Sequence, residues 1–508
     1  MLIVNLSLAF ADTTDLSTQA LEKEHLARYL MNQASYLIDS GKYFEALESY
    51  KTAAETTAND KTKIEALLSK ATLLMSFLDA PEEALKVYQD LSKGETSTSE
   101  IAQYREGLLY FELKRYKEAD ATLRNYLKKY PSGRFRFQTE ALAREVSKIL
   151  KTGTEPVTPP SSDLKQAPQL RVRVCNTRGE ALITGSSVCV HGQGCKPQWR
   201  LGISNGKLMI NGVQSSADTV TFTGKNFLTI AEGNKKKQLR GELQAKIDKG
   251  KLLVINVLDI EDYLYSVVPS ENPASWPLET LKAQAVAART YAYYQLLHRK
   301  NWAYDLVDYA GDQAYGGMAK EHKRSSKAVD ETRGMVLTYD NKPILAMFSA
   351  NSGGYTADSK AVFDLQKPYL IARSDPASLH GSMASWTKKY PRVKIVAALS
   401  QRGINANGLE SIQSVEKGPS GRIIKIRIVK KDGSTMVLRN RPTLRRALDL
   451  PEILFDIRKN EDIFVFEGHG WGHGVGYSQW GSAHMGKTKN FNEILAFYYN
   501  KAKIDKLW

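Results

Sequence analysis

VVPSENPASWPLETLKAQAVAARTYA, residues 267–292, is the stretch on which the fold of this chain depends. Its first nine residues hold two prolines and two serines around Glu271, a composition that predicts a loop. Pro277 suits the first turn of a helix, where a missing N–H removes no hydrogen bond. The apolar residues that follow step by three and four, which predicts that helix: Leu278, Leu281, Ala285, Ala288 and Ala292. We therefore expect a core helix with Glu271 held in a loop at its start.

Three polar, glycine-containing segments follow this helix: DYAGDQAYGG (308–317), FSANSGGYTADS (348–359) and GHGWGHGVGYSQWG (468–481). Together with Pro269-Ser270-Glu271 and the alanine-rich LKAQAVAARTYA helix, they closely resemble the motifs of the SpoIID/LytB family of bacterial cell-wall proteins, both in their order and in their residues. The resemblance covers about residues 240–508. It implies either a lytic transglycosylase that cuts peptidoglycan glycan strands or a protein that enhances a cell-wall amidase.

The domain organisation follows from changes in periodicity. Residues 20–150 predict helices, and alanines 46, 84 and 119 recur close to the ~34-residue period of tetratricopeptide-like repeats. Such a stack offers a concave surface to a protein partner, or serves as a spacer. Residues 151–169 are rich in proline and polar residues and predict a linker. From 170 to 508 we expect the SpoIID/LytB-like domain, with a β-rich insertion or lead-in around 175–240.

The predicted fold class is therefore α+β, a SpoIID-like catalytic domain with a β-rich lead-in, preceded by an all-α tetratricopeptide-like domain. Residues 1–11, MLIVNLSLAFA, predict a truncated signal peptide, and with it export to the periplasm or cell envelope. No other segment approaches the ~18–20 apolar residues of a membrane span. In an exported protein, Cys189 and Cys195, which flank a glycine-containing loop, can form a disulfide, and Cys175 is then the odd cysteine.

The charge is unevenly spread along the chain. The net charge is +16, but residues 1–150 carry 20 Lys and Arg against 22 Asp and Glu, which leaves 51 against 33 for the rest. The region with the family motif therefore bears the positive charge, which suits an anionic polymer such as cell wall or nucleic acid. Because no nucleic-acid-binding module is recognisable, we expect no nucleic-acid partner.

Glu271 is the predicted catalytic residue. Cleavage of a glycosidic bond needs a proton delivered to the leaving oxygen. Burial would raise the pKa of this glutamate, whereas a helix N-terminus just after it would favour the carboxylate. In a lytic transglycosylase one glutamate protonates the leaving oxygen and then takes the proton of the muramic C6 hydroxyl as the 1,6-anhydro ring closes. Hydrolysis stays open, with Asp308, Asp312 and Asp358 as candidate second carboxylates.

The remaining candidate residues would bind or position the sugar. Glycines around His469 and His473 disfavour a zinc-binding helix, so we expect no metal and no cofactor. The predicted substrate-binding residues are Ser270, Arg289, Gln313, Tyr315, Ser352, Gly353, Gly354, Tyr355, His473, Tyr477 and Gln479. A purely structural role for Glu271 or His473 is the alternative, and Arg289, Ser352 and Tyr355 can be either substrate or scaffold residues. We expect the segments to converge on one open groove, with a largely buried Glu271 on its floor and Ser352 and His473 beside the same sugar.

Two functional hypotheses follow. The first is a lytic transglycosylase that cleaves between MurNAc and GlcNAc, on glycan strands that the resemblance implies are stripped of stem peptides. The second is a non-enzymatic cell-wall binder that enhances an N-acetylmuramoyl-L-alanine amidase held by the repeat domain.

Overall fold

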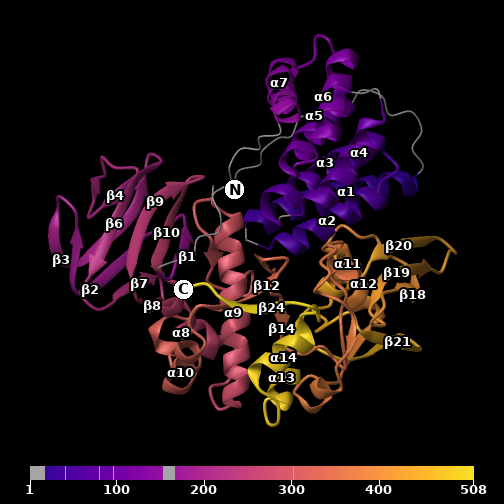
Figure 1. The fold of residues 1–508 in the computed structure, drawn as a ribbon. Coiled ribbons are helices and arrows are strands. Elements are labelled where there is room, and N and C mark those ends of the chain that lie inside the picture. The colour runs from indigo at the N-terminus through magenta and orange to yellow at the C-terminus, as the bar shows by residue number, and fades with distance from the viewer. Residues whose placement is uncertain (1–17, 40–41, 79, 95–96, 153–165, 301) are drawn as a thin grey trace.

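The computed structural model describes residues 18–39, 42–78, 80–94, 97–152, 166–300 and 302–508 (Figure 1). The predicted signal peptide, residues 1–11, and most of the predicted linker lie outside these ranges. Helical residues come first and a sheet-rich region follows, which confirms the predicted α+β class with an all-α part ahead of it. Among the described residues no helix combines the length and the apolar character that crossing a membrane would take.

The N-terminal helical domain is a stack in which each helix packs on the next (Figure 1). Alanines 46, 84 and 119, predicted from the repeat period, have no exposed surface. Gly107 allows close approach, since a Cβ there would lie 2.6 Å from Leu123 Cδ2. The helices are Thr18–Asp39 (α1), Tyr43–Thr56 (α2), Asp60–Phe77 (α3), Pro81–Ser92 (α4), Ser97–Glu112 (α5), Tyr116–Lys129 (α6) and Arg136–Thr152 (α7).

The β-rich lead-in forms a large sheet with the order β11-β1-β10-β9-β6-β2-β3-β4-β5, in which β7 pairs with β2 and β8. Its hairpins are antiparallel, and Cys189 and Cys195 form a disulfide between β2 and β3. Its first ten strands are Gln169–Thr177 (β1), Ala181–Val190 (β2), Gly194–Ser204 (β3), Lys207–Ile210 (β4), Val213–Gln214 (β5), Thr219–Gly224 (β6), Leu228–Glu232 (β7), Lys235–Leu239 (β8), Glu242–Asp248 (β9) and Lys251–Asp259 (β10).

Two helices follow β10, and the first corrects the sequence analysis. Ile260–Glu271 (α8) is helical through Pro269, so Glu271 ends a helix rather than lying in a loop. Asp259 caps α8 by accepting from the Glu261 N–H, and four fully buried side chains form an i, i+3, i+4, i+7 stripe along it: Ile260, Tyr263, Leu264 and Val267. This stripe holds the helix although Pro269 removes one donor. The predicted core helix is Leu278–His298 (α9), buried along most of its length.

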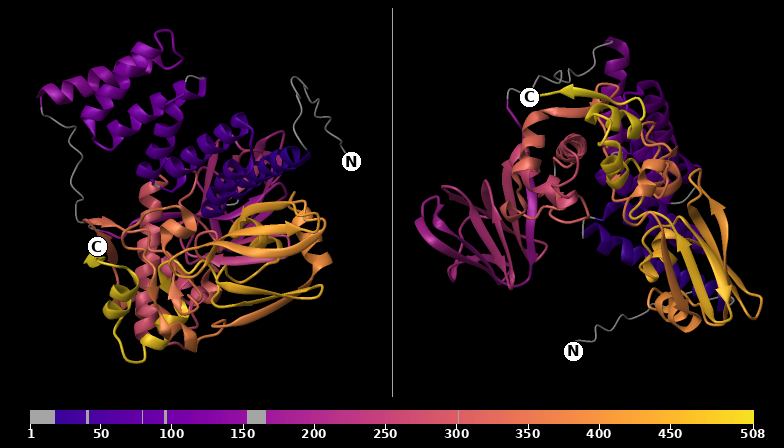
Figure 2. Two further views of the ribbon diagram at one scale, coloured as in Figure 1. Left: turned by 90° about the vertical axis from the view of Figure 1, so that its right-hand side faces the viewer. Right: turned by 90° about the horizontal axis from the view of Figure 1, so that it is seen from below.

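Some of the later elements pack around α9, whereas β18–β21 lie to one side of it (Figures 1 and 2). The later elements that contact α9 are β11, α10, β12, β13, α13 and α14. Parallel pairing of β14 with β23 sets Ser349 beside Ser478, and isolated bridges join Asn351 to Trp471 and Ala357 to Val475. These pairings bring two of the glycine-containing segments together. The elements are Leu306–Val307 (β11), Met318–Lys320 (η1), Lys323–Glu331 (α10), Met335–Tyr339 (β12), Lys342–Pro343 (β13), Phe348–Ser349 (β14), Tyr355–Thr356 (β15), Ser359–Phe363 (α11), Arg373–Ser374 (β16), Pro376–His380 (η2), Trp386–Pro391 (β17), Arg392–Ser400 (α12), Leu409–Lys417 (β18), Ile423–Lys430 (β19), Thr435–Arg439 (β20), Arg441–Arg445 (η3), Phe455–Asn460 (β21), Ile463–Gly468 (β22), Tyr477–Ser478 (β23), Gln479–Met485 (α13), Phe491–Tyr498 (α14) and Lys503–Lys506 (β24).

The helical domain docks on this C-terminal part (Figure 1). Apolar residues of α1 and α2 share a buried cluster with β18, β19 and β20. Arg441 Nη1 donates to Glu48 Oε2 (3.0 Å), with both side chains at least nine-tenths buried. The Phe44 and Phe363 rings lie 4.7 Å apart. The first repeats are therefore engaged with the chain's own second half.

Candidate functional site

The carboxyl of Glu271 is held by two hydrogen-bond donors. The backbone N–H of Ala314 donates to Oε1 (2.8 Å) and the Gln479 side-chain amide donates to Oε2 (3.1 Å). Ala314 comes from the 308–317 segment, and Gln479 begins α13 at the end of the 468–481 segment. Two predicted segments therefore meet at one carboxyl.

Burial raises the pKa of Glu271, and these two hydrogen bonds offset the rise only in part. The helix dipole acts in the same direction as burial, because Glu271 lies at the negative, C-terminal end of α8. This is the reverse of the effect expected from the sequence, in which the N-terminus of the following helix, α9, favours the carboxylate of Glu271 and lowers its pKa. A raised pKa favours the protonated form, which a general acid requires.

A cavity of about 280 Å³ opens onto Glu271. Trp471 is 51% exposed and offers an aromatic face to it. Aromatic rings pack well against the apolar faces of ligands, and a pyranose ring presents such faces. The cavity walls also include Gln479 and residues of α2 and of segments 310–312, 347–350 and 471–473.

His473 lines this cavity with Glu271, so the glycine loop and the candidate acid face the same space. Its Nδ1 accepts from the Val475 N–H (3.0 Å), which leaves the ring proton on Nε2. Burial, reinforced by Arg441, Arg422 and Arg445, lowers the pKa of His473 to about 3. The imidazole is therefore neutral near pH 7 and does not act there as a cationic acid.

Arg422 fixes the two glycine-containing segments to each other. It is fully buried and donates to the carbonyls of Ser352 and Tyr355, both at 2.8 Å. Gly474 has φ +69°, and a Cβ there would lie 2.0 Å from Arg422 Nη2. Glycine at 474 is thus required by both backbone conformation and space. No motif in the sequence marked Arg422.

Several predicted substrate-binding residues lie in the core instead. Arg289 is fully buried against Glu261 (2.7 Å), Gln313 donates to the Ala288 carbonyl (3.3 Å), and the Tyr315 hydroxyl donates to Asn256 (2.8 Å). None of the three lines the Glu271 cavity. Their polar groups are satisfied within the protein, so the predicted sugar contacts by Arg289, Gln313 and Tyr315 are corrected to structural contacts.

The hydroxyl residues of the other segments are also mostly occupied. Ser270 donates to the Ser266 carbonyl (2.7 Å), Ser352 to Asp375 (2.6 Å) and Tyr477 to Ser482 (2.7 Å). Ser349 is the serine that lines the cavity.

Gly353, Gly354 and Tyr355 shape the turn rather than the cavity wall. Both glycines have positive φ, and a Cβ on Gly353 would lie 2.7 Å from the Gly470 nitrogen. Tyr355 is 38% exposed.

Five residues of the cavity lie outside every site segment predicted from the sequence, namely Phe44, Glu45, Met347, Phe363 and Arg441. Phe44 and Glu45 belong to α2, more than 200 residues before Glu271, and follow the repeat pattern rather than any ligand-binding pattern. Arg441 lies in η3 and links α2 to the cavity through Glu48.

The candidate second carboxylates already have partners within the protein, although Asp312 also lines the Glu271 cavity. Asp312 pairs with buried Arg299 (2.9 Å), Asp308 pairs with Lys237, and Asp358 caps α11 by accepting from Ala361 (3.0 Å). Glu45 is a further carboxylate that lines the cavity of Glu271. Within the described ranges, no three His, Cys, Asp or Glu side chains are grouped so as to hold a metal ion.

The fold and the site define a sheet-rich domain with a part-buried glutamate at a cavity, and comparison with known proteins identifies its family. The family model described as Stage II sporulation protein matches residues 248–339, and a model for a domain of unknown function matches 368–476. An uncharacterized protein of Brachyspira hyodysenteriae is 36% identical over 255 residues, 50% of this chain and 68% of that protein. The chain belongs to the Stage II sporulation protein D (SpoIID) family.

Two relatives carry functional names. Stage II sporulation protein D of Bacillus subtilis is 29% identical over 271 residues, 49% of this chain and 75% of that protein. The amidase enhancer of the same organism is 29% identical over 286 residues, 46% of this chain and 39% of that protein. The predicted family resemblance is thereby confirmed, and the family model covers the motif at 267–292.

Proposed function

We propose that this protein is an exported peptidoglycan lytic transglycosylase that cleaves denuded glycan strands between MurNAc and GlcNAc. The observation that carries the proposal is Glu271, a carboxyl whose pKa is raised by burial and which opens onto a cavity shared with Trp471 and His473. Export is supported by the Cys189–Cys195 disulfide, because such bonds persist in oxidising compartments.

In this mechanism protonated Glu271 gives its proton to the glycosidic oxygen as the bond from C1 of MurNAc breaks. The resulting carboxylate takes the proton of the C6 hydroxyl, whose oxygen bonds to C1 and closes the 1,6-anhydro ring. Glu271 is protonated again and no water is consumed. Ala314 N–H and the Gln479 amide stabilise the transient carboxylate.

The test incubates the full chain with purified denuded glycan and identifies the new ends by mass spectrometry. Anhydro ends are expected from the natural protein and should disappear in Glu271→Gln. Glu45→Gln is the matched control, because it changes a second carboxyl of the same cavity that this mechanism does not use. Reducing ends without anhydro ends, lost in both variants, would indicate two-carboxylate hydrolysis and refute the proposal.

Enhancement of an amidase is the second candidate, and the amidase-enhancer relative favours it. It places the partner on the helical repeats, of which α5–α7 lie away from the docked interface (Figure 1). Stimulation of an amidase by both the natural protein and Glu271→Gln, with no glycan cleavage by either, would select this function.

A further inference from the structure

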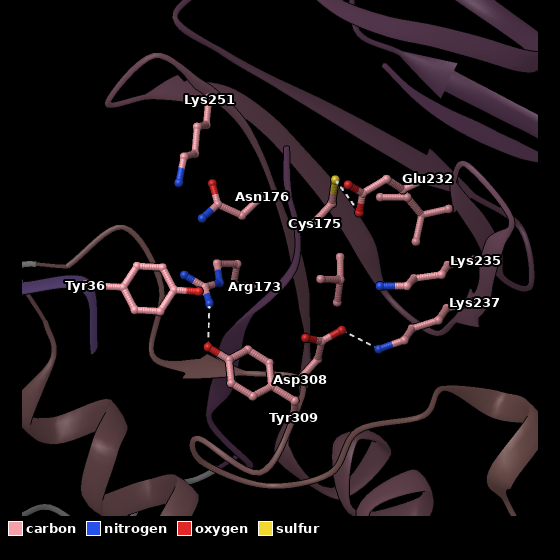
Figure 3. A pocket seen from close by; sticks show the side chains of 12 residues that line it. Tyr36, Arg173, Cys175, Asn176, Glu232, Lys235, Lys237, Lys251, Asp308 and Tyr309 are labelled. Atoms are coloured by element: carbon pink, nitrogen blue, oxygen red, sulfur yellow. Dashed lines mark hydrogen bonds and ion pairs between the residues drawn. The ribbon is translucent and has the colours of Figure 1, made fainter. Parts of the chain in front are cut away.

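A second cavity, of about 570 Å³, lies where α1, the strands β1, β7, β8 and β10 and residues 308–309 meet (Figure 3). It is about twice as large as the cavity at Glu271. The two cavities are neighbours along one segment: Asp308 and Tyr309 line the larger one, whereas residues 310–312 line the other. The two linings are therefore adjacent along the chain.

The lining of the larger cavity is cationic. It includes four basic side chains and two carboxylates: Arg173, Lys235, Lys237 and Lys251, against Glu232 and Asp308. Both carboxylates are already engaged, since Asp308 pairs with Lys237 and Glu232 accepts from the Cys175 thiol (Figure 3). A neutral thiol does not cancel the charge of Glu232, so Arg173, Lys235 and Lys251 face one carboxylate and the lining keeps a net positive charge.

Lys235 and Lys251 carry this remaining charge. Both side chains extend into the cavity from different strands, β8 and β10 (Figure 3). In the part of the chain that the structure describes, neither ammonium group has an ion-pair or hydrogen-bond partner. Arg173, in contrast, is fixed by the hydroxyls of Tyr304 (2.9 Å) and Tyr309 (3.0 Å).

Two neutral groups complete the lining in a way that suits a sugar. Tyr36 of α1 is 71% exposed and presents an aromatic ring at the cavity edge. Asn176 offers an exposed side-chain amide beside Lys251 (Figure 3). An aromatic face, an amide and two ammonium groups together match a pyranose that carries a carboxylate.

We propose that this cavity is a second saccharide subsite, which binds a carboxylate-bearing sugar of the glycan strand through Lys235 and Lys251. The proposal rests on the proposed function in taking a glycan strand as the ligand. Removal of a stem peptide breaks an amide of muramic acid and leaves its lactyl carboxylate free. A denuded strand thus carries one negative charge per disaccharide at this position, and a strand of GlcNAc alone carries none. The subsite distinguishes the two by charge.

The test measures binding by calorimetry with the full chain carrying Glu271→Gln, so that no ligand is cleaved during titration. Short denuded glycan fragments are compared with chito-oligosaccharides of equal length. The double change Lys235→Ala and Lys251→Ala should weaken binding of the denuded fragments by roughly tenfold, from two partly exposed ion pairs. Binding of the neutral oligosaccharide should not change. Lys207→Ala with Lys225→Ala, two exposed lysines of the same β-rich region, is the matched control.

Equal affinities for the charged and neutral oligosaccharides, or an unchanged affinity in the Lys235/Lys251 variant, would overturn the proposal. A polyol-phosphate polymer that binds this cavity more tightly than denuded glycan would overturn the carboxylate assignment. These outcomes are separate from the test of the reaction, because binding is measured without cleavage. Lysine-dependent binding with no anhydro products would retain the subsite and reject the transglycosylase.

Discussion

The ion pair between Glu48 of α2 and Arg441 of η3 should hold the helical domain against the cavity wall. The pair is joined by one hydrogen bond of 3.0 Å, and the side chains are 2% and 10% exposed. Glu48→Ala removes the carboxylate and leaves the guanidinium in a buried place, where the Arg441 Nε has no other partner among the described residues.

The expected loss of stability depends on the contacts that Arg441 keeps in the Glu48→Ala variant. Removing one partner of a buried pair costs about 3–5 kcal/mol. Arg441 still lies over the Phe363 ring at 4.6 Å, a contact that retains part of its stabilisation. We therefore expect a loss near the lower limit, about 3 kcal/mol in the free energy of unfolding. Adding Arg441→Met should recover much of the loss, because no buried charge then remains unpaired.

Urea unfolding of the full chain, followed by circular dichroism, measures these differences. Asp90→Ala is the control, since its partner Lys93 and Asp90 itself are 74% and 75% exposed and the change should leave stability unaltered. If Glu48→Ala costs less than about 1 kcal/mol, or if the double variant is no more stable than the single one, the pair does not hold the domains together.

Two further predictions concern α8 and α9. Arg289→Met should destabilise the protein by about 3–5 kcal/mol in urea unfolding, because it leaves Glu261 buried without its cation. Glycan binding by the folded fraction should not weaken. If binding weakens while stability in urea is unchanged, Arg289 contacts the substrate after all. Because burial raises the pKa of Glu271, its ionisation costs folding free energy as pH rises above the ordinary glutamate range, and this cost is absent at lower pH. Glu271→Gln should therefore raise the melting temperature at pH 7–8, with a gain that shrinks as the pH falls toward ~4.5, and a gain independent of pH would show that burial of the charge is not its cause.

The fold was predictable where periodicity is strong and local. The alanines at 46, 84 and 119 marked the repeats because small residues are needed wherever paired helices approach closely. The apolar stripe of α9 was equally clear. In contrast, α8 was misread because two prolines near its end outweighed the Ile260–Val267 stripe that begins upstream.

The site was predictable only in part. Glu271, His473 and Gln479 were found because each lies in a distinctive segment, and they do share one cavity. Arg289, Gln313 and Tyr315 lie in equally distinctive segments yet serve the core, because a buried polar residue and a ligand-binding one look alike in sequence. Residues that act through tertiary contacts, such as Arg422 and Glu45, carry no local pattern at all.

The contribution of α2 to the cavity links the two functional hypotheses. Phe44 and Glu45 form part of the wall around Glu271, while Glu48 of the same helix anchors the domain through Arg441. The cavity of about 280 Å³ is close to the lower end of the ~300–1,000 Å³ range of ligand pockets, and a polymer needs a path that continues beyond it. Under the proposed function, the position of α2 would set how much of a strand fits beside Glu271. Under the second candidate function, a protein bound to the repeats would contact the stack to which α2 belongs. If both proposals hold, partner binding and glycan access would be coupled through α2, and the tests therefore use the full chain.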